Sequence, residues 1–153
     1  MNRIHFIFII MLKVSYMQKE NKGESSGVFR VVLIDPEYKT LEIMQKLLSR
    51  QRGVEITAAF QGVDESLAFV AQTSPDLIFM DAHQIKSTGR AYLEQIRTLA
   101  GNPHIILTSF VSDDAVEALS QKGAFDFLLK PFDPGDIGEL IRRLRHFRSL
   151  SNR

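Results

Sequence analysis

The chain has 153 residues, of which 44% are hydrophobic, and this is enough for one domain with a single buried core. Its 19 basic and 18 acidic residues give a net charge of +1, so the composition offers no electrostatic case for binding nucleic acid or an anionic membrane. The absence of cysteine excludes disulfides, thiolate metal sites and cysteine nucleophiles, and it is consistent with a reducing compartment. Any metal would need oxygen or imidazole ligands.

The first 27 residues are expected to lie outside the folded domain. Residues 4–12 form a strongly apolar run after Arg3, but a membrane span takes about 20 apolar residues, and no small-residue cleavage site follows the run. A polar stretch at 18–27 is typical of the flexible start of a soluble domain. We interpret residues 1–16 as an upstream extension or a non-native start, with a membrane anchor as the alternative.

From Phe29 onward, strand-like and helix-like segments alternate five times, which predicts a doubly wound α/β domain. The expected domain spans 28–148 and is followed by a short tail, 149–153. The first elements expected in chain order are strand 29–34, a helix ending near residue 53, strand 54–60, helix 64–73 and strand 77–81. They are followed by a loop at 83–88, a helix from residue 89 to about 100, strand 104–108, helix 112–122 and strand 125–129. The last element is a helix on which Ile137, Leu140, Ile141 and Leu144 share one stripe.

Four of the predicted strands are short apolar runs that each end in one polar residue. Such runs, separated by helices, are typical of parallel strands buried on both faces. Because the carboxyl ends of parallel strands open onto one edge of the sheet, where ligands bind in open α/β folds, we expect these polar residues to converge. The polar residues are Asp35, Asp81, Thr108 and Lys130.

Each of these residues also has an ordinary structural interpretation, which the sequence leaves open. Asp35 before Pro36 fits a helix N-cap, Asp81 a loop start, Thr108 a β-branched strand former, and Lys130 a surface lysine. Their occurrence at four strand ends of one topology favours a functional interpretation.

Two carboxylates, a hydroxyl and an ammonium at one edge suit a particular chemistry. Close carboxylates repel one another, so the site would favour a proton or a hard divalent cation, for which magnesium is the natural choice. The lysine would neutralise added negative charge, and the threonine could donate to a phosphoryl oxygen. The set therefore suits phosphoryl transfer to an aspartate, where catalysis is mostly positioning and charge neutralisation.

Four segments, at residues 32–35, 75–81, 106–109 and 123–132, resemble the receiver domain of two-component response regulators. The resemblance covers about residues 29–147. It implies a flavodoxin-like (βα)5 fold, a doubly wound parallel sheet with strand order 2-1-3-4-5. A receiver would be a signalling protein rather than an enzyme, at most phosphorylating and dephosphorylating itself.

The same resemblance implies a role for each site residue. Asp81 would be the phosphoacceptor, Lys130 the phosphate-binding lysine, and Thr108 the switch hydroxyl. Phe127 would be the switch aromatic, and the bond between Lys130 and Pro131 would be cis. The magnesium ligands would come from Asp35, Asp81, Glu37 and the backbone of His83.

The chain also departs from the receiver pattern. Receivers usually carry two adjacent acids after the first strand, and the second is the main side-chain magnesium ligand, but here that position is Pro36. Proline has no side-chain oxygen, so we expect weakened magnesium binding. Ile85 replaces the usual proline of the next loop. His83 stands two positions after the expected phosphoacceptor, where its bulk would shield or perturb that aspartate.

These observations favour a single-domain, cytoplasmic response regulator that accepts a phosphoryl group from a histidine kinase or phosphotransfer protein and signals through altered protein contacts. The alternative is a phosphorylation-independent pseudo-receiver that acts as an interaction module. A flavodoxin-like cofactor protein is disfavoured, because the loops lack a glycine-rich or hydroxyl-rich phosphate cradle. We expect no membrane or nucleic-acid partner, and we interpret the basic run at 142–148 as a solvated helix face.

Overall fold

A computed structural model describes residues 27–88, 90–111 and 126–151. The elements are β1 (Phe29–Ile34), α2 (Tyr38–Ser49), β2 (Val54–Phe60), α3 (Val63–Thr73), β3 (Leu77–Asp81), α4 (Ala82–Thr88), α5 (Arg90–Leu99), β4 (His104–Ser109), β5 (Asp126–Leu129) and α7 (Pro134–Ser151). The predicted apolar N-terminal run, the helix at 112–122 and Phe125 lie outside the described residues. Within them, no helix is long and apolar enough to cross a membrane.

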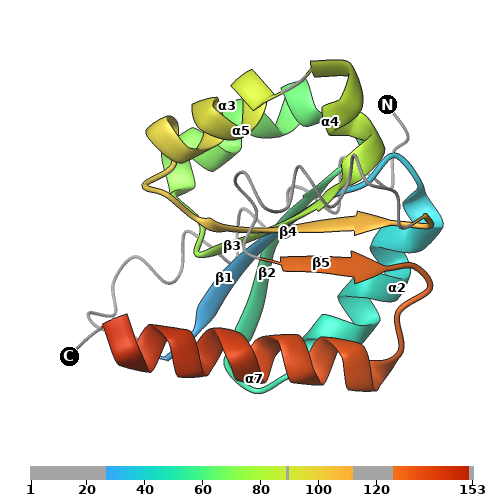
Figure 1. Ribbon diagram of the computed structural model, residues 1–153, viewed down its shortest axis with the longest axis vertical. Coiled ribbons are helices and arrows are strands. Elements are labelled where there is room, and N and C mark those ends of the chain that lie inside the picture. Colours follow the sequence, from blue (N-terminus) through green and yellow to red (C-terminus); the bar gives the residue numbers. More distant parts are fainter. Residues whose placement is uncertain (1–26, 89, 112–125, 152–153) are drawn as a thin grey trace.

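The five strands form one parallel sheet in the order β2-β1-β3-β4-β5 (Figure 1), which confirms the predicted topology. Helices cover both faces of this sheet. In Figure 1, α3, α4 and α5 lie on one side, whereas α2 and α7 lie on the other. The fold is therefore the flavodoxin-like α/β arrangement expected from the alternating pattern.

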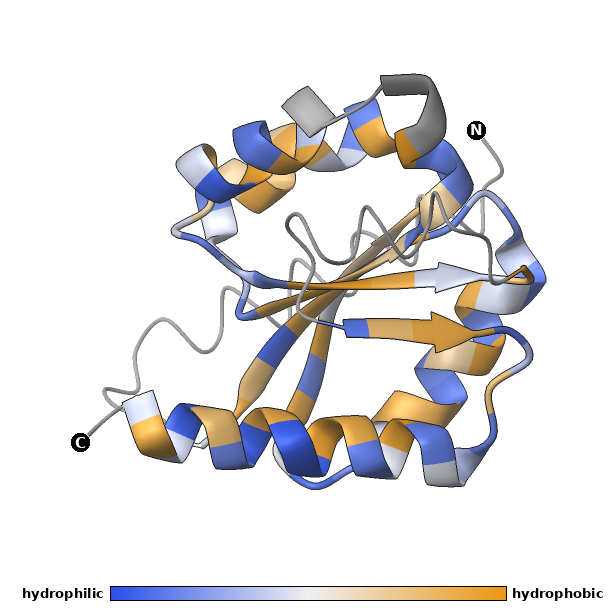
Figure 2. Cartoon of the chain, viewed as in Figure 1, coloured by the Kyte–Doolittle hydropathy of each residue, from blue (hydrophilic) through white to orange (hydrophobic). Residues whose placement is uncertain are grey.

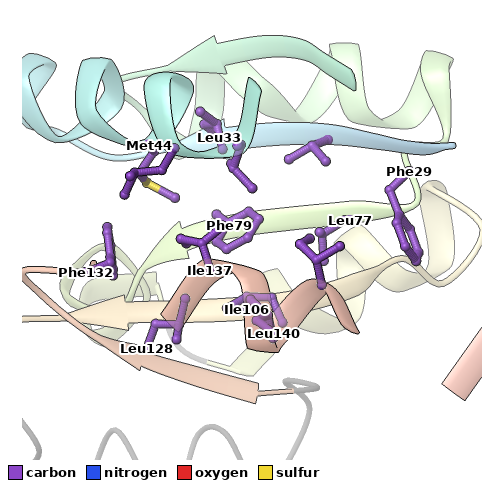
Figure 3. Close-up of a cluster of buried hydrophobic side chains, with 14 of the residues drawn as sticks. Phe29, Leu33, Met44, Leu77, Phe79, Ile106, Leu128, Phe132, Ile137 and Leu140 are labelled. Atoms are coloured by element: carbon purple, nitrogen blue, oxygen red, sulfur yellow. The ribbon is translucent and has the colours of Figure 1, made fainter. Parts of the chain in front are cut away.

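Two apolar clusters, one on each face of the sheet, form the core. Val31 and Leu33 of β1 point into the cluster that packs against α2 and α7, part of which Figure 3 shows. Their neighbours Val32 and Ile34 point into the opposite cluster, against α3 and α5. Because successive side chains of a strand alternate between faces, a strand covered on both faces must be apolar throughout. Figure 2 shows this apolar colouring along the inner strands.

A β-bulge interrupts the pairing of the edge strand β2 with β1. Val31 pairs with Ile56 and Val32 pairs with Ala58, so Thr57 is the extra residue between them. The Thr57 hydroxyl donates a 3.1 Å hydrogen bond to the backbone carbonyl of Val31. The buried hydroxyl of Thr57 therefore has a hydrogen-bond partner within the bulge.

The segment at 83–88 differs from its predicted structure. The sequence predicted a loop, but α4 begins at Ala82, directly after the last residue of β3. The seven-residue segment is too short to reveal a helical period in sequence. It buries Ala82 and Ile85 against the sheet, and a carboxylate caps its first turn. At the other end of the domain, α7 continues to Ser151, beyond the boundary expected at 148.

Candidate functional site

Asp35 follows β1 at the carboxyl edge of the sheet and is 1% exposed. Its Oδ1 accepts a 2.8 Å hydrogen bond from the backbone N–H of Glu37, and its Oδ2 lies 2.5 Å from Nζ of Lys130. Helix α2 begins at Tyr38 with Glu37 as its N-cap residue. The interpretation of Asp35 as the helix N-cap is therefore wrong, and its carboxylate faces the site.

Asp81 is the last residue of β3 and uses its carboxylate in the same way. Its Oδ1 accepts a 2.9 Å hydrogen bond from the backbone N–H of His83, in the first turn of α4. Its Oδ2 lies 2.7 Å from Nζ of Lys130. The carboxylate of Asp81 therefore caps the first turn of α4 with one oxygen and forms a buried ion pair with the other.

Lys130 is not the surface lysine that one interpretation allowed, because only 7% of the residue is exposed. It follows β5, where its backbone N–H donates to the carbonyl of Ser109 in β4. Its ammonium bridges Asp35 and Asp81, which lie 95 and 49 positions away in sequence. The peptide bond between Lys130 and Pro131 is cis, as expected.

Burial and charge act against each other in this cluster. Burial lowers the pKa of Lys130, but hydrogen bonds and charge from Asp35 and Asp81 outweigh that effect and raise its pKa above 10.5. For Asp35, burial raises the pKa above its ordinary 3.8, and the hydrogen bonds from Lys130 and Glu37 offset only part of the rise. The buried ammonium is therefore held charged beside a carboxylate whose ionised form burial disfavours.

Thr108 lies on β4, which pairs with β3, and Phe127 lies on β5, the edge strand beyond β4. Thr108 is 1% exposed and is the register partner of Asp81 across the β3 and β4 pair. Phe127 pairs with Leu107 and packs, partly buried, against the core cluster on the α3 and α5 side. The sheet thus brings Thr108 beside Asp81 and sets Phe127 one strand further out.

The carboxyl edge is hollowed by a cavity of about 170 Å³, hereafter the acid cavity. It is lined by Asp35, Pro36, Glu37, Asp81, His83, Phe110 and Lys130. Phe110 was not among the residues expected from sequence. The residue is 59% exposed, and the centroid of its ring lies 5.1 Å from Nζ of Lys130, within the range of a cation–π interaction. The signal that could have indicated Phe110 is its place as a large apolar residue directly after a strand that ends in polar residues.

Two glutamines connect the loops after β1 and β2 to helix α4, beside the acid cavity. Nε2 of Gln61, after β2, donates a 3.0 Å hydrogen bond to the carbonyl of Pro36. Nε2 of Gln84, on α4, donates a 2.6 Å hydrogen bond to the carbonyl of Gln61. The loop after Asp35 is therefore tethered to the helix that follows Asp81. No pattern in the sequence indicates this connection.

Comparison with known proteins agrees with this geometry. The family model described as the response regulator receiver domain matches residues 31–142. The chain belongs to the receiver domain family. Receivers are signalling domains of two-component systems, so the family resemblance found in the sequence is confirmed.

Curated relatives of this receiver include two transcriptional regulatory proteins. BtsR of Escherichia coli is 28% identical over 80% of this chain and 50% of its own length. LiaR of Bacillus subtilis is 31% identical over 75% of this chain and 55% of its own length. The chain spans about half the length of the curated relatives it matches.

Solved structures show the same fold. The REC domain of AraT, a response regulator from Geobacillus stearothermophilus, superposes with a TM-score of 0.71 at 20% identity and covers 82% of this chain and 99% of that domain. The response regulatory domain of mrkE from Klebsiella pneumoniae gives a TM-score of 0.64 at 25% identity, over 76% of this chain and 95% of that domain.

Receiver domains generally bind Mg²⁺ at their acidic pocket, so the residues of this pocket can be tested against that ion. Mg²⁺ keeps several waters and is commonly held by one or two carboxylates together with substrate phosphate oxygens, a set that Asp35 and Asp81 can supply. Pro36 adds no side-chain oxygen. The described part of the chain brings together no group of three acidic or histidine side chains that could hold a metal. Asp35 and Asp81 thus fit an ion that is shared with a phosphoryl group.

Two further candidate ligands differ in what they can offer. Glu37 lines the acid cavity, and its Oε2 accepts a 3.3 Å hydrogen bond from the hydroxyl of Thr40. His83 lies in the first turn of α4, and its backbone N–H donates to Oδ1 of Asp81. Glu37 and the backbone of His83 both stay predicted ligands of the ion.

Proposed function

We propose that this receiver accepts a phosphoryl group on Asp81 from a histidine kinase or phosphotransfer protein in the cytoplasm, and that it signals through changed contacts with a downstream protein. The observation that supports this most is the ammonium of Lys130, 2.7 Å from Oδ2 of Asp81 and almost fully buried. A fixed cation beside the accepting carboxylate offsets the charge that a phosphoryl group brings.

In the proposed step, a carboxylate oxygen of Asp81 forms a bond to phosphorus while the bond from phosphorus to the donor's imidazole nitrogen breaks. The imidazole leaves with the electron pair and takes a proton from solvent. Lys130 neutralises the phosphoryl oxygens, and the hydroxyl of Thr108 donates to one of them. Mg²⁺, held by Asp35 and Asp81 with Glu37 as a further candidate, would supply additional positive charge to the phosphoryl group.

The proposed response is local. New charge on Asp81 draws the hydroxyl of Thr108 toward the phosphoryl group, and Phe127 follows inward on the next strand. This would alter the surface around β5, α7 and the predicted helix at 112–122. A partner that binds one form of that surface more tightly would then sense phosphorylation.

Intact mass spectrometry tests the proposal. The purified protein and its Asp81→Asn variant are incubated with phosphoramidate, with and without Mg²⁺, and then with a phosphorylated histidine kinase. We expect a gain of one phosphoryl group that requires both Mg²⁺ and Asp81. A folded protein that gains no phosphoryl group from either donor would contradict the proposal.

The second candidate function is a phosphorylation-independent interaction module. Pro36 favours it, because a weak cation site would slow phosphorylation. The bridge from Lys130 to both carboxylates also favours it, since the ammonium offsets one of the two carboxylate charges without a metal. This candidate predicts near-background Mg²⁺ affinity together with undiminished partner binding by Asp81→Asn. Clean Mg²⁺-dependent phosphorylation would exclude it.

A further inference from the structure

A second cavity, of about 180 Å³, lies beside the acid cavity and is hereafter called the apolar hollow. It is lined by Glu37, Lys39, Thr40, Ile43, Phe110, Lys130, Pro131 and Phe132. Two of its walls differ in burial. Phe132 is 9% exposed and belongs to the core cluster against α2 and α7 (Figure 3), whereas Ile43 on α2 is 50% exposed.

The two cavities share part of their lining. Glu37, Phe110 and Lys130 contribute to both, so the two cavities adjoin one another at these residues. The acid cavity supplies carboxylates and the lysine ammonium, whereas the hollow supplies two aromatic rings, a proline and an isoleucine. Together they form a site with an anion-binding half and an apolar half, which suits a ligand with the same division.

The size of the hollow limits the apolar part of such a ligand. An apolar protein cavity of about 150 Å³ accommodates one benzene ring. A hollow of about 180 Å³ is therefore large enough for one aromatic ring. A methyl group would leave most of it unfilled and would bury little apolar surface.

We propose that the apolar hollow binds the leaving group of a small phosphodonor, and that this receiver prefers aryl acyl phosphates to short alkyl ones. This inference rests on the proposed phosphorylation of Asp81. In the step, a carboxylate oxygen of Asp81 bonds to phosphorus and the bond from phosphorus to the acyl oxygen breaks. The aryl carboxylate leaves with the electron pair, so the charge balances without proton transfer or a further reactant.

The first test compares benzoyl phosphate with acetyl phosphate as donors, with intact mass as the readout. Because the two donors differ in intrinsic reactivity, the measured quantity is the ratio of their rates in each protein. Ile43→Ser removes a half-exposed apolar wall and should lower the benzoyl-to-acetyl ratio about fivefold. Leu150→Ser, a matched change at a residue that is 54% exposed on α7, should leave the ratio unchanged. Urea unfolding confirms that both variants are folded.

The second test measures binding without transfer. Phenacylphosphonate and acetonylphosphonate have the form of the two donors, but a methylene group replaces the bridging oxygen. By NMR titration of the full chain, we expect phenacylphosphonate to bind roughly tenfold more tightly, with the largest shifts at Ile43 and Phe110. Ile43→Ser should remove most of this preference.

The two tests separate failure of the inference from failure of the proposed function. The inference alone fails if acetyl phosphate phosphorylates Asp81, Ile43→Ser leaves the benzoyl-to-acetyl ratio unchanged, and the two phosphonates bind equally. The hollow would then not be a leaving-group site, while the proposed function stands. Preferential binding of phenacylphosphonate, with no phosphorylation by any donor, would overturn the proposed function and with it the leaving-group role, and would leave the hollow as an aryl-binding site alone.

Discussion

The ammonium nitrogen of Lys130 lies 2.5 Å from Oδ2 of Asp35, although the two residues are 95 positions apart in the chain. Both side chains are almost fully buried. A buried ion pair of this kind adds little net stability over an apolar pair, but losing one partner leaves an uncompensated charge. The Lys130 position is therefore sensitive to substitution even before any phosphoryl chemistry takes place.

Lys130→Met should lower the free energy of unfolding by about 3 kcal/mol near neutral pH, because two carboxylates would then share a buried site without a cation. Urea unfolding measures the change. Asp35→Asn in the same chain should restore part of the loss by removing one of the stranded charges. Lys46→Met, at an exposed position on α2, is the matched control and should change little. An equal effect of the two methionine substitutions would contradict the prediction.

The raised pKa of Lys130 predicts how stability depends on pH. The protonated lysine is favoured by the fold, so its contribution is complete below its ordinary pKa of 10.5 and is lost as pH rises through the higher folded-state pKa. We compare the free energies of unfolding of the wild type and Lys130→Met between about pH 9 and pH 12. Their difference should be constant at first and then shrink. A difference that stays constant throughout would show that the fold does not raise the pKa of Lys130.

The cap that Asp81 provides to α4 can be separated from its charge. Asp81→Asn and Asp81→Ala both remove the carboxylate beside Lys130, but only asparagine keeps an oxygen that accepts the N–H of His83. Asp81→Ala should therefore be less stable than Asp81→Asn by about 1 kcal/mol, the usual value of a helix N-cap. Chemical denaturation of the two variants gives this difference directly. Equal stabilities would show that α4 does not depend on the cap.

The glutamine tethers should hold the loop that carries Asp35. Gln61→Met removes the donor to the carbonyl of Pro36 and preserves the length of the side chain. Loss of one such hydrogen bond, roughly 1 kcal/mol, should speed amide exchange at Glu37 about fivefold, because local opening of this loop becomes easier. Gln45→Met on α2 serves as the control. No change in exchange at Glu37 would mean that the tether does not hold the loop.

The site was predictable where it depends on strand topology, and it was not where it depends on local contacts. Continuous apolar runs before Asp35 and Asp81 predicted buried parallel strands, and parallel strands bring Lys130 to the same edge from the far end of the chain. Helix α4 was missed because its seven residues are too few to show an apolar period, and the contact of Asp81 with its first turn is visible only in the structure. Phe110 was missed because its contact with Lys130 joins loops after two different strands. The roles of Thr108 and Phe127 stay predictions.

The bulge at Thr57 has a consequence for how copies of this receiver meet in solution. β2 is an edge strand of seven residues, and a regular strand of that length offers free backbone groups to which a second chain can pair. The extra residue adds local twist and breaks the regular spacing of those groups. An incoming strand would therefore find no continuous row of partners along β2, and the bulge acts as a built-in protection against edge-to-edge aggregation.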